Sequence, residues 1–213
     1  MRQKNLKVVD DMIGQMKLSG KPKVLGNDFY QRPDVLGIAR ELIGKVLVAN
    51  INGERTTGII TETEAYAGIT DRASHAWNDR RTPRTEIMYG AGGHAYVYLC
   101  YGIHSLFNVV TNTIGIPHAV LIRAICPIEG LETMLMRAKR TQPDKTFGKG
   151  PGNVSKILGI HYTDSGLPLT ESLGKIFIED HQMAFPDDAI KVTPRIGIQY
   201  AGSDAALPYR FVV

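Results

Sequence analysis

Two glutamates and a tyrosine recur at every second position in the segment ITETEAY, residues 60–66. Because side chains two residues apart share one face of a strand, we expect Ile60, Glu62, Glu64 and Tyr66 to line the same face. A carboxylate beside an aromatic ring can accept a proton from water and offset positive charge on a bound substrate. The simpler alternative is a solvated face of an antiparallel sheet, where alternate polar residues are common.

A second segment rich in aromatic residues, GGHAYVYLCYGIHSLFNVV, spans residues 92–110. Its alternation predicts a strand with Tyr96 and Tyr98 on one face. Gly102 then favours a turn, which places Tyr101 near the tip of a hairpin. Apolar side chains at exposed tips often mark contact with a partner, so Tyr101 is a candidate for binding rather than for packing.

The spacing of the histidines and cysteines indicates no metal site. His75 follows the acidic strand in the run ASHAW, without the HxH or HExxH spacing of zinc ligands. Cys100 and Cys126 lie in apolar runs and have no ligand spacing either. We expect both to be buried free thiols in a reducing compartment.

The elements that must position these residues are mainly strands. The pattern predicts an α+β fold: a single domain with a curved, largely antiparallel β-sheet and flanking helices. Asp34 is a candidate helix N-cap, and Asn52-Gly53 between alternating runs predicts a hairpin turn. Strands are expected over residues 45–51, 56–66, 94–101, 107–113, 118–128, 175–180 and 190–198, and helices over 34–44, 129–140 and the end of the Gly-rich run 148–160.

The charge distribution separates an N-terminal extension from the rest of the chain. Residues 1–23 contain six Lys or Arg and two Asp or Glu, which accounts for the net charge of +4. We therefore expect a basic extension over 1–23 and one folded domain over 24–213. Within the domain, basic residues gather over 72–84 and 137–156, which favours a polyanionic partner. No apolar run is long enough to span a bilayer and no secretory signal is visible, so we expect a cytoplasmic protein without a membrane partner.

Seven motifs, in their order along the chain, resemble those of the alkyladenine DNA glycosylase family, the 3-methyladenine DNA glycosylases of the methylpurine type. They are ETEAY, SHA, TPR, YVYLCYGIH, FNVV, VLIRAICPIEGLETM and KGPGNVSKILGI. The resemblance covers residues 24–213, which it identifies as a DNA glycosylase domain. It implies an enzyme of base-excision repair that flips an alkylated or deaminated purine out of duplex DNA and hydrolyses its N-glycosidic bond.

The resemblance also implies roles for individual residues. Glu64 would activate the water that displaces the base. The pocket that sandwiches the extruded base would be formed by three rings: Tyr66, His75 and Tyr98. Asn108 would reject the 2-amino group of guanine, and Arg123 would orient the site and the nucleotide. Tyr101 would enter the duplex as a wedge and fill the vacated space.

Contacts with the DNA backbone are expected from five basic residues: Arg80, Arg81, Arg84, Lys149 and Lys156. No lysine matches a position where it could form a Schiff base, so we expect a monofunctional enzyme that does not cleave the strand. The partner would be double-stranded DNA that contains damaged purines. The protein would act as a monomer, without a cofactor or a metal, at the nucleoid in a bacterial cytoplasm.

Two alternatives from other functional classes remain open. Glu62 and Glu64, about 7 Å apart as i and i+2 neighbours on a strand, resemble the carboxylate pair of an inverting carbohydrate hydrolase. A non-catalytic nucleic-acid-binding module would keep the basic residues and Tyr101 but leave Glu64 inert. Release of free base from alkylated DNA separates the three functions.

Overall fold

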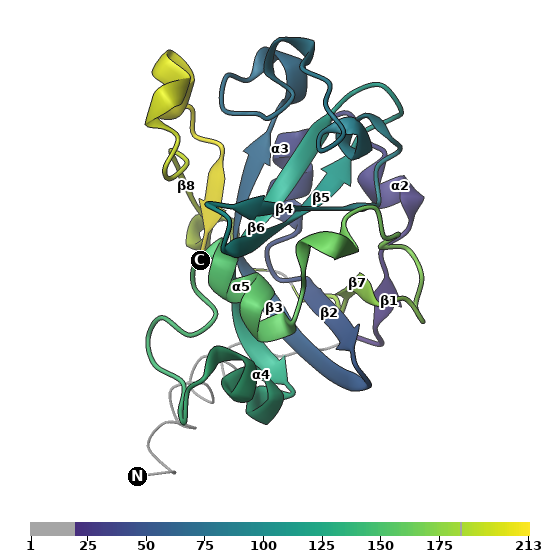
Figure 1. Ribbon diagram of the computed structural model, residues 1–213, viewed down its shortest axis with the longest axis vertical. Coiled ribbons are helices and arrows are strands. Elements are labelled where there is room, and N and C mark those ends of the chain that lie inside the picture. Colours follow the sequence, from purple (N-terminus) through teal and green to yellow (C-terminus); the bar gives the residue numbers. More distant parts are fainter. Residues whose placement is uncertain (1–19, 184) are drawn as a thin grey trace.

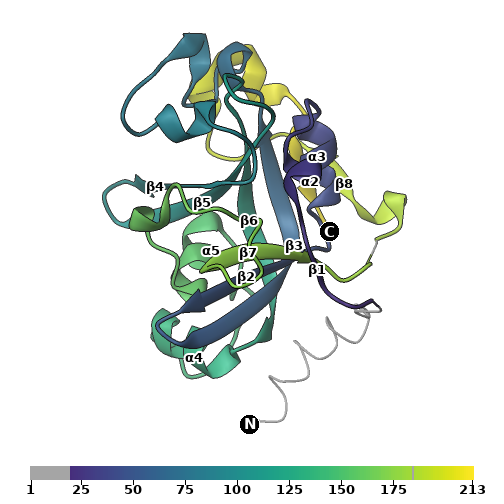
Figure 2. The ribbon, with the colours of Figure 1, turned by 90° about the vertical axis from the view of Figure 1, so that its right-hand side faces the viewer.

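One curled antiparallel sheet organises the chain, as the computed structural model shows for the residues that it describes, 20–183 and 185–213 (Figure 1). Its strands are β1 (Lys23–Val24), β2 (Val46–Ile51), β3 (Glu54–Tyr66), β4 (Ala95–Cys100), β5 (His104–Thr111), β6 (His118–Glu129), β7 (Ile176–Asp180), β8 (Lys191–Thr193) and β9 (Arg210–Val212). They follow the order β1-β7-β2-β3-β6-β5-β4, with β9 on β3 and β8 on β9. Figure 2 shows the curl, with β7 lying across the direction of β6. The predicted α+β fold with a curved antiparallel sheet is confirmed.

Four α-helices accompany the sheet in the described part of the chain. They are α2 (Asn27–Tyr30), α3 (Val35–Glu41), α4 (Leu131–Ala138) and α5 (Pro151–Leu158). Short 3₁₀ helices lie over Gly68–Thr70, Trp77–Asp79, Glu86–Tyr89, Tyr162–Asp164, Asp187–Ala189 and Gln199–Ala206. Asp34 caps α3 as predicted, because its Oδ1 accepts a hydrogen bond from the Gly37 N–H at 2.8 Å. Pro151 is the first residue of α5, where its missing N–H costs nothing.

The central strand β3 changes its neighbour halfway along its length. Its first half pairs with β2, its second half with β9, and β6 runs along the other edge. The register with β6 shifts between Ile60 and Glu62, which leaves Thr61 as an extra residue. Ile60 therefore packs into the main core together with Ala65, while Glu62 reaches arginines outside that core. The expectation that Ile60 shares the face of the glutamates is wrong, because a bulge breaks the alternation.

Both predicted hairpin turns are present. Asn52 and Gly53 have positive φ angles of 57° and 79°, as a tight turn between β2 and β3 requires. Cys100 pairs with His104 at the end of the β4–β5 hairpin, so the turn contains Tyr101. The Tyr101 side chain is 92% exposed. The predicted place of this tyrosine at an exposed tip is confirmed.

The strand expected over residues 190–198 is only three residues long. β8 ends at Thr193, because Pro194 has no N–H to donate to a neighbouring strand. The residues after it form a loop in which Arg195 is buried and Ile196 is half exposed. The prediction of a strand is wrong over 194–198, and this loop reaches the end of β3.

Most of the basic N-terminal extension, residues 1–19, lies outside the described residues. Lys23 and Val24 pair with Asp180 and Glu179 at one edge of the sheet. Among residues 20–183 and 185–213, no helix is both long enough and apolar enough to cross a membrane.

Candidate active site

A cavity of about 400 Å³ lies at the C-terminal end of β3, walled by β4, β5, β6 and the loop 196–198. Seven candidate site residues from the sequence line it: Tyr66, His75, Arg84, Tyr98, Tyr101, Asn108 and Arg123. Glu64 is not among the lining residues, but contacts two of them, Tyr66 and Arg123. The structure therefore brings Glu64 together with an arginine that is 59 positions away in the sequence.

Glu64 is completely buried and hydrogen-bonded on both carboxylate oxygens. Its Oε1 accepts from the Ile196 N–H at 2.8 Å, and its Oε2 accepts from the Tyr66 hydroxyl at 2.9 Å. Arg123 Nη1 lies 3.4 Å from Oε2. Burial raises the pKa of Glu64 above its usual range, and these three donors partly offset that rise. A carboxyl group with a raised pKa is suited to taking a proton near neutral pH.

Glu62 has a different environment from Glu64. Its Oε1 accepts from Arg210 Nε at 2.6 Å and from Arg123 Nε at 3.0 Å. Arg123 therefore bridges the two glutamates, whereas the guanidinium group of Arg210 pairs with Glu62. Glu62 is held between two guanidinium groups and, like Glu64, does not line the cavity. This is not the arrangement of two carboxyl groups that face a common saccharide cleft.

Aromatic rings form one wall of the cavity. His75 packs edge-on against Tyr98, with ring centroids 4.6 Å apart. The Tyr96 hydroxyl lies 2.7 Å from His75 Nδ1 and fixes the orientation of the imidazole. Burial, together with the charges of Arg84 and Arg80, lowers the pKa of His75 to about 4. The imidazole is therefore neutral at neutral pH.

Asn108 is buried on β5 and is held in one orientation. Its Nδ2 donates to the backbone carbonyls of Tyr96 at 3.1 Å and Leu106 at 3.2 Å. Because both amide hydrogens have backbone partners, the carbonyl oxygen is the polar atom that Asn108 can offer to the cavity.

The family model described as methylpurine-DNA glycosylase (MPG) matches residues 28–213. The chain belongs to the methylpurine-DNA glycosylase family. A protein of Chlamydia abortus named "Putative 3-methyladenine DNA glycosylase" is 46% identical over 191 residues, which cover 89% of this chain and 98% of that protein. A protein of Bacillus cereus (strain AH187) with the same name is 41% identical over 189 residues, which cover 86% of this chain and 92% of that protein. The chain is thus a DNA glycosylase, a class of DNA-repair enzyme.

Of the five basic residues expected to contact the DNA backbone, Arg84 lines the cavity. Arg84 lies over the Tyr98 ring, with 6.0 Å between the guanidinium carbon and the ring centroid. Arg81 stacks on Tyr89 at 4.0 Å and pairs with Glu86 at 3.4 Å. Three further basic residues are exposed: Arg80 beside this group, Lys149 just before α5 and Lys156 within it. A Cβ atom at Gly152 of α5 would lie 3.1 Å from the His104 ring, so the start of this helix adjoins the β4–β5 hairpin (Figure 1).

Several residues at or beside the cavity were not predicted from the sequence. Arg195 and Ile196 fell within an expected strand, although Pro194 just before them was a visible signal against it. Tyr200 lines the cavity and donates from its hydroxyl to the Ala73 carbonyl at 3.2 Å. Cys126 is a buried free thiol as predicted, but Cys100 is only partly buried and lines the cavity. Among the described residues, no three His, Cys, Asp or Glu side chains are grouped to hold a metal ion.

Proposed function

We propose that this glycosylase flips an alkylated or deaminated purine of the 3-methyladenine class out of duplex DNA into the cavity. It then hydrolyses the N-glycosidic bond with a water that Glu64 activates. The observation that carries the proposal is the environment of Glu64: a fully buried carboxylate that contacts two cavity residues, Tyr66 and Arg123. The damaged duplex is the partner, and the working form is a monomer in a bacterial cytoplasm, at the nucleoid. The relatives described are bacterial.

Glu64 has the properties that this chemistry needs. The transition state of glycosidic cleavage develops positive charge on the sugar, which a nearby carboxylate offsets. The same carboxylate accepts a proton from the attacking water. Its raised pKa makes it a stronger base than an exposed carboxylate, while Arg123 and the two hydrogen bonds keep the ionised form accessible.

The aromatic wall is suited to a cationic purine. Alkylated purines such as 3-methyladenine carry positive charge, which is attracted to the faces of Tyr66 and Tyr98. His75 is neutral, since its pKa is lowered to about 4, and so does not repel that charge. The side chain of Asn108, fixed by two backbone carbonyls, would occupy the space beside the purine edge and so exclude the guanine 2-amino group sterically. Tyr101 at the exposed tip would fill the space that the flipped base leaves.

No lysine is among the residues that line the cavity in the described part of the chain. A lyase that cleaves the strand needs an amine to form a Schiff base with the sugar. We therefore propose a monofunctional enzyme that leaves an abasic site.

Replacing Glu64 with Gln tests the proposal, because the amide keeps the size of the side chain but cannot accept the proton from water. Excision of neutral hypoxanthine under single-turnover conditions should slow by about 10²–10⁴-fold. In the unchanged protein the rate should rise with pH through the raised pKa of Glu64, since only the ionised form is a base. This acidic limb should disappear in Glu64→Gln.

The control is Glu62→Gln, two residues away and also paired with Arg123. It should keep most of the activity, and both variants should still bind a duplex with an abasic analogue. Comparable losses in both variants would favour a paired-carboxylate mechanism instead. Full activity of Glu64→Gln on hypoxanthine contradicts the proposed role of Glu64, and an unchanged protein that binds DNA but releases no base is a binding module.

A further inference from the structure

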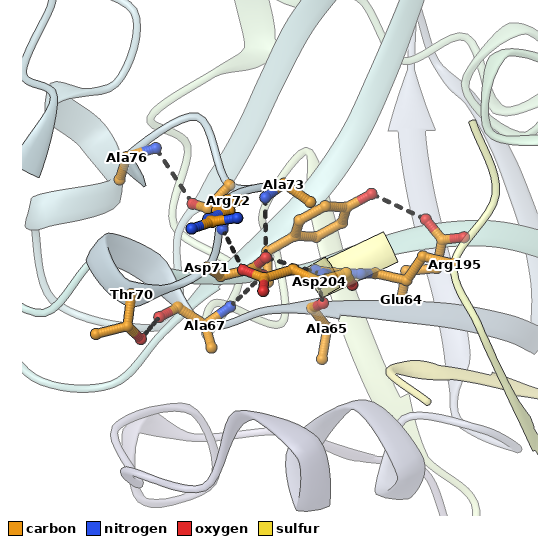
Figure 3. Close-up of polar contacts among 12 residues, drawn as sticks. Glu64, Ala65, Ala67, Thr70, Asp71, Arg72, Ala73, Ala76, Arg195 and Asp204 are labelled. Carbon is orange, nitrogen blue, oxygen red and sulfur yellow. Dashed lines mark hydrogen bonds and ion pairs between the residues drawn. The ribbon is translucent and has the colours of Figure 1, made fainter. Parts of the chain in front are cut away.

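A buried ion pair lies next to the proposed catalytic residue and joins segments far apart in sequence (Figure 3). Arg195 Nη1 and Nη2 donate to the two carboxylate oxygens of Asp71 at 2.5 and 2.8 Å. The same carboxylate accepts from the backbone N–H groups of Ala67 and Ala73, both at 3.0 Å. A bidentate pair with this many additional donors is geometrically well defined. It ties the turn after β3 to the loop after β8.

The guanidinium group of Arg195 also supports Tyr66. Its carbon lies 4.9 Å from the Tyr66 ring centroid and 5.1 Å from the Tyr209 ring centroid, so it contacts both rings. Arg195 Nη1 additionally donates to the Ala65 carbonyl at 2.9 Å. The residue before Tyr66 and the ring of Tyr66 are thus both held by one planar cation.

The two hydrogen bonds to Glu64 come from residues that this pair holds. Ile196, which donates its N–H to Oε1, is the next residue after Arg195. Tyr66, which donates its hydroxyl to Oε2, lies against the Arg195 guanidinium. Neither Asp71 nor Arg195 lines the cavity, so their influence on it passes through these neighbours.

We propose that the buried Asp71–Arg195 pair is a positioning element, which aligns the Tyr66 hydroxyl and the Ile196 N–H as the two neutral donors to Glu64. The inference rests on the proposed function, in which Glu64 is the base. Asp71 and Arg195 are positioning residues, since they act through Tyr66 and Ile196. Lysine cannot reproduce the planar fork of arginine, so Arg195→Lys keeps the charge but loses the alignment.

The consequence is a change in the pKa of Glu64. The charged or titratable groups that face Glu64 are Glu62, Tyr66, Arg123, Arg195, Tyr200 and, opposite it on β9, Arg210. Arg195→Lys leaves all these charges in place but weakens the two hydrogen bonds that favour the ionised carboxylate. The pKa of Glu64 therefore rises, and the acidic limb of the excision rate moves to higher pH.

The experiment compares Arg195→Lys with Arg55→Lys. Arg55 lies near the other end of β3, pairs with Glu129 and Glu179 and lies over the Phe177 ring, so it is a matched control remote from the cavity. Two quantities are measured: the pH dependence of single-turnover hypoxanthine excision, and the carboxyl titration of Glu64 by ¹³C NMR in DNA-free protein. In Arg195→Lys both midpoints should rise by about one pH unit, because losing a hydrogen bond to a charged group changes its pKa by about that much. In Arg55→Lys neither should move.

Unchanged midpoints in folded Arg195→Lys overturn the inference and leave the pair a purely structural one. Where Arg195→Lys does not fold, Tyr209→Leu takes its place, because it removes the ring from one side of the guanidinium and should shift both midpoints in the same direction. Different measurements contradict the proposed role of Glu64 and the proposed role of the Asp71–Arg195 pair. Activity in Glu64→Gln contradicts the role of Glu64 as the base, whereas the NMR titration still reports on the alignment of its donors.

Discussion

Single side chains in this glycosylase take their roles from their surroundings. Glu62 and Glu64 are two residues apart on β3, yet Glu62 is held by two arginines and Glu64 by one arginine and two neutral donors. An exposed histidine has a pKa of about 6.5 and is partly protonated near neutral pH. Burial and the charges of Arg84 and Arg80 lower the pKa of His75 to about 4, so its imidazole is neutral there. At the scale of the residue, burial and the neighbouring charges decide which groups are ionised.

Asn108→Ser tests the proposed exclusion of guanine. Serine is shorter, so the space beside the purine edge should accommodate a 2-amino group. Release of normal guanine relative to 3-methyladenine should increase by about tenfold, the effect of a modest change in pocket shape. The measurement is the ratio of the two free bases released from duplex substrates.

The matched control for this prediction is Asn50→Ser. Asn50 also donates from its amide to a backbone carbonyl, that of Gly174 at 3.2 Å, but does not line the cavity. It should leave the ratio unchanged. An unchanged ratio in Asn108→Ser as well would count against the assignment of Asn108.

Glu64 lies on a strand in the interior of the sheet, whereas Tyr101 lies in an exposed hairpin turn. β3 pairs with β6 along one edge and with β2 and then β9 along the other, which fixes the position of Glu64 within the sheet. The β4–β5 hairpin instead ends in a turn with Tyr101 at a φ of 50° and a nearly fully exposed ring. The proposed insertion of Tyr101 into DNA needs this exposure, while the proposed role of Glu64 as the base needs the rigid sheet.

Tyr101→Ser should weaken binding to a duplex with an abasic analogue by about tenfold, because stacking of an aromatic ring on bases contributes roughly 1–3 kcal/mol. The melting temperature should hardly change, since an exposed ring contributes little to the core. Tyr162→Ser serves as the control, because Tyr162 is also an exposed tyrosine but does not line the cavity. A large loss of thermal stability in Tyr101→Ser would show that the ring packs within the protein and would contradict the wedge.

The molecule as a whole places its positive charge unevenly. Arg80, Arg81 and Arg84 form one group beside the cavity. Lys149 lies just before α5, whose start adjoins the β4–β5 hairpin, and Lys156 lies in its last turn. Binding to undamaged duplex should therefore be weak and steeply dependent on salt, since each phosphate that the protein neutralises releases counterions.

Simultaneous charge reversal of Arg80, Arg81 and Arg84 should flatten this dependence. The slope of log affinity against log salt should fall in magnitude by about 0.9 for each phosphate that the variant no longer neutralises. The control reverses Lys23, Arg32 and Arg40, which lie in β1 and around α2 and α3 and do not line the cavity. Equal changes in both triple variants would mean that total charge, rather than the Arg80–Arg84 group, sets the salt dependence.

The sequence by itself determined the features that depend on neighbours along the chain. Asp34 caps its helix, Asn52-Gly53 makes its turn, and Tyr101 lies at its tip because each needs only a few adjacent residues. The family followed from motifs whose order spans nearly the whole domain.

Only the tertiary structure decided what surrounds those motifs. Thr61 forms a bulge where the neighbour of β3 changes from β2 to β9. β3 and β9 pair across about 150 positions in the sequence. Asp71 and Arg195 meet across 124 positions, and Ile196 reaches Glu64 across 132. Local patterns carry no information on such contacts, because their free energy comes from burial and hydrogen bonds that exist only once the sheet has formed.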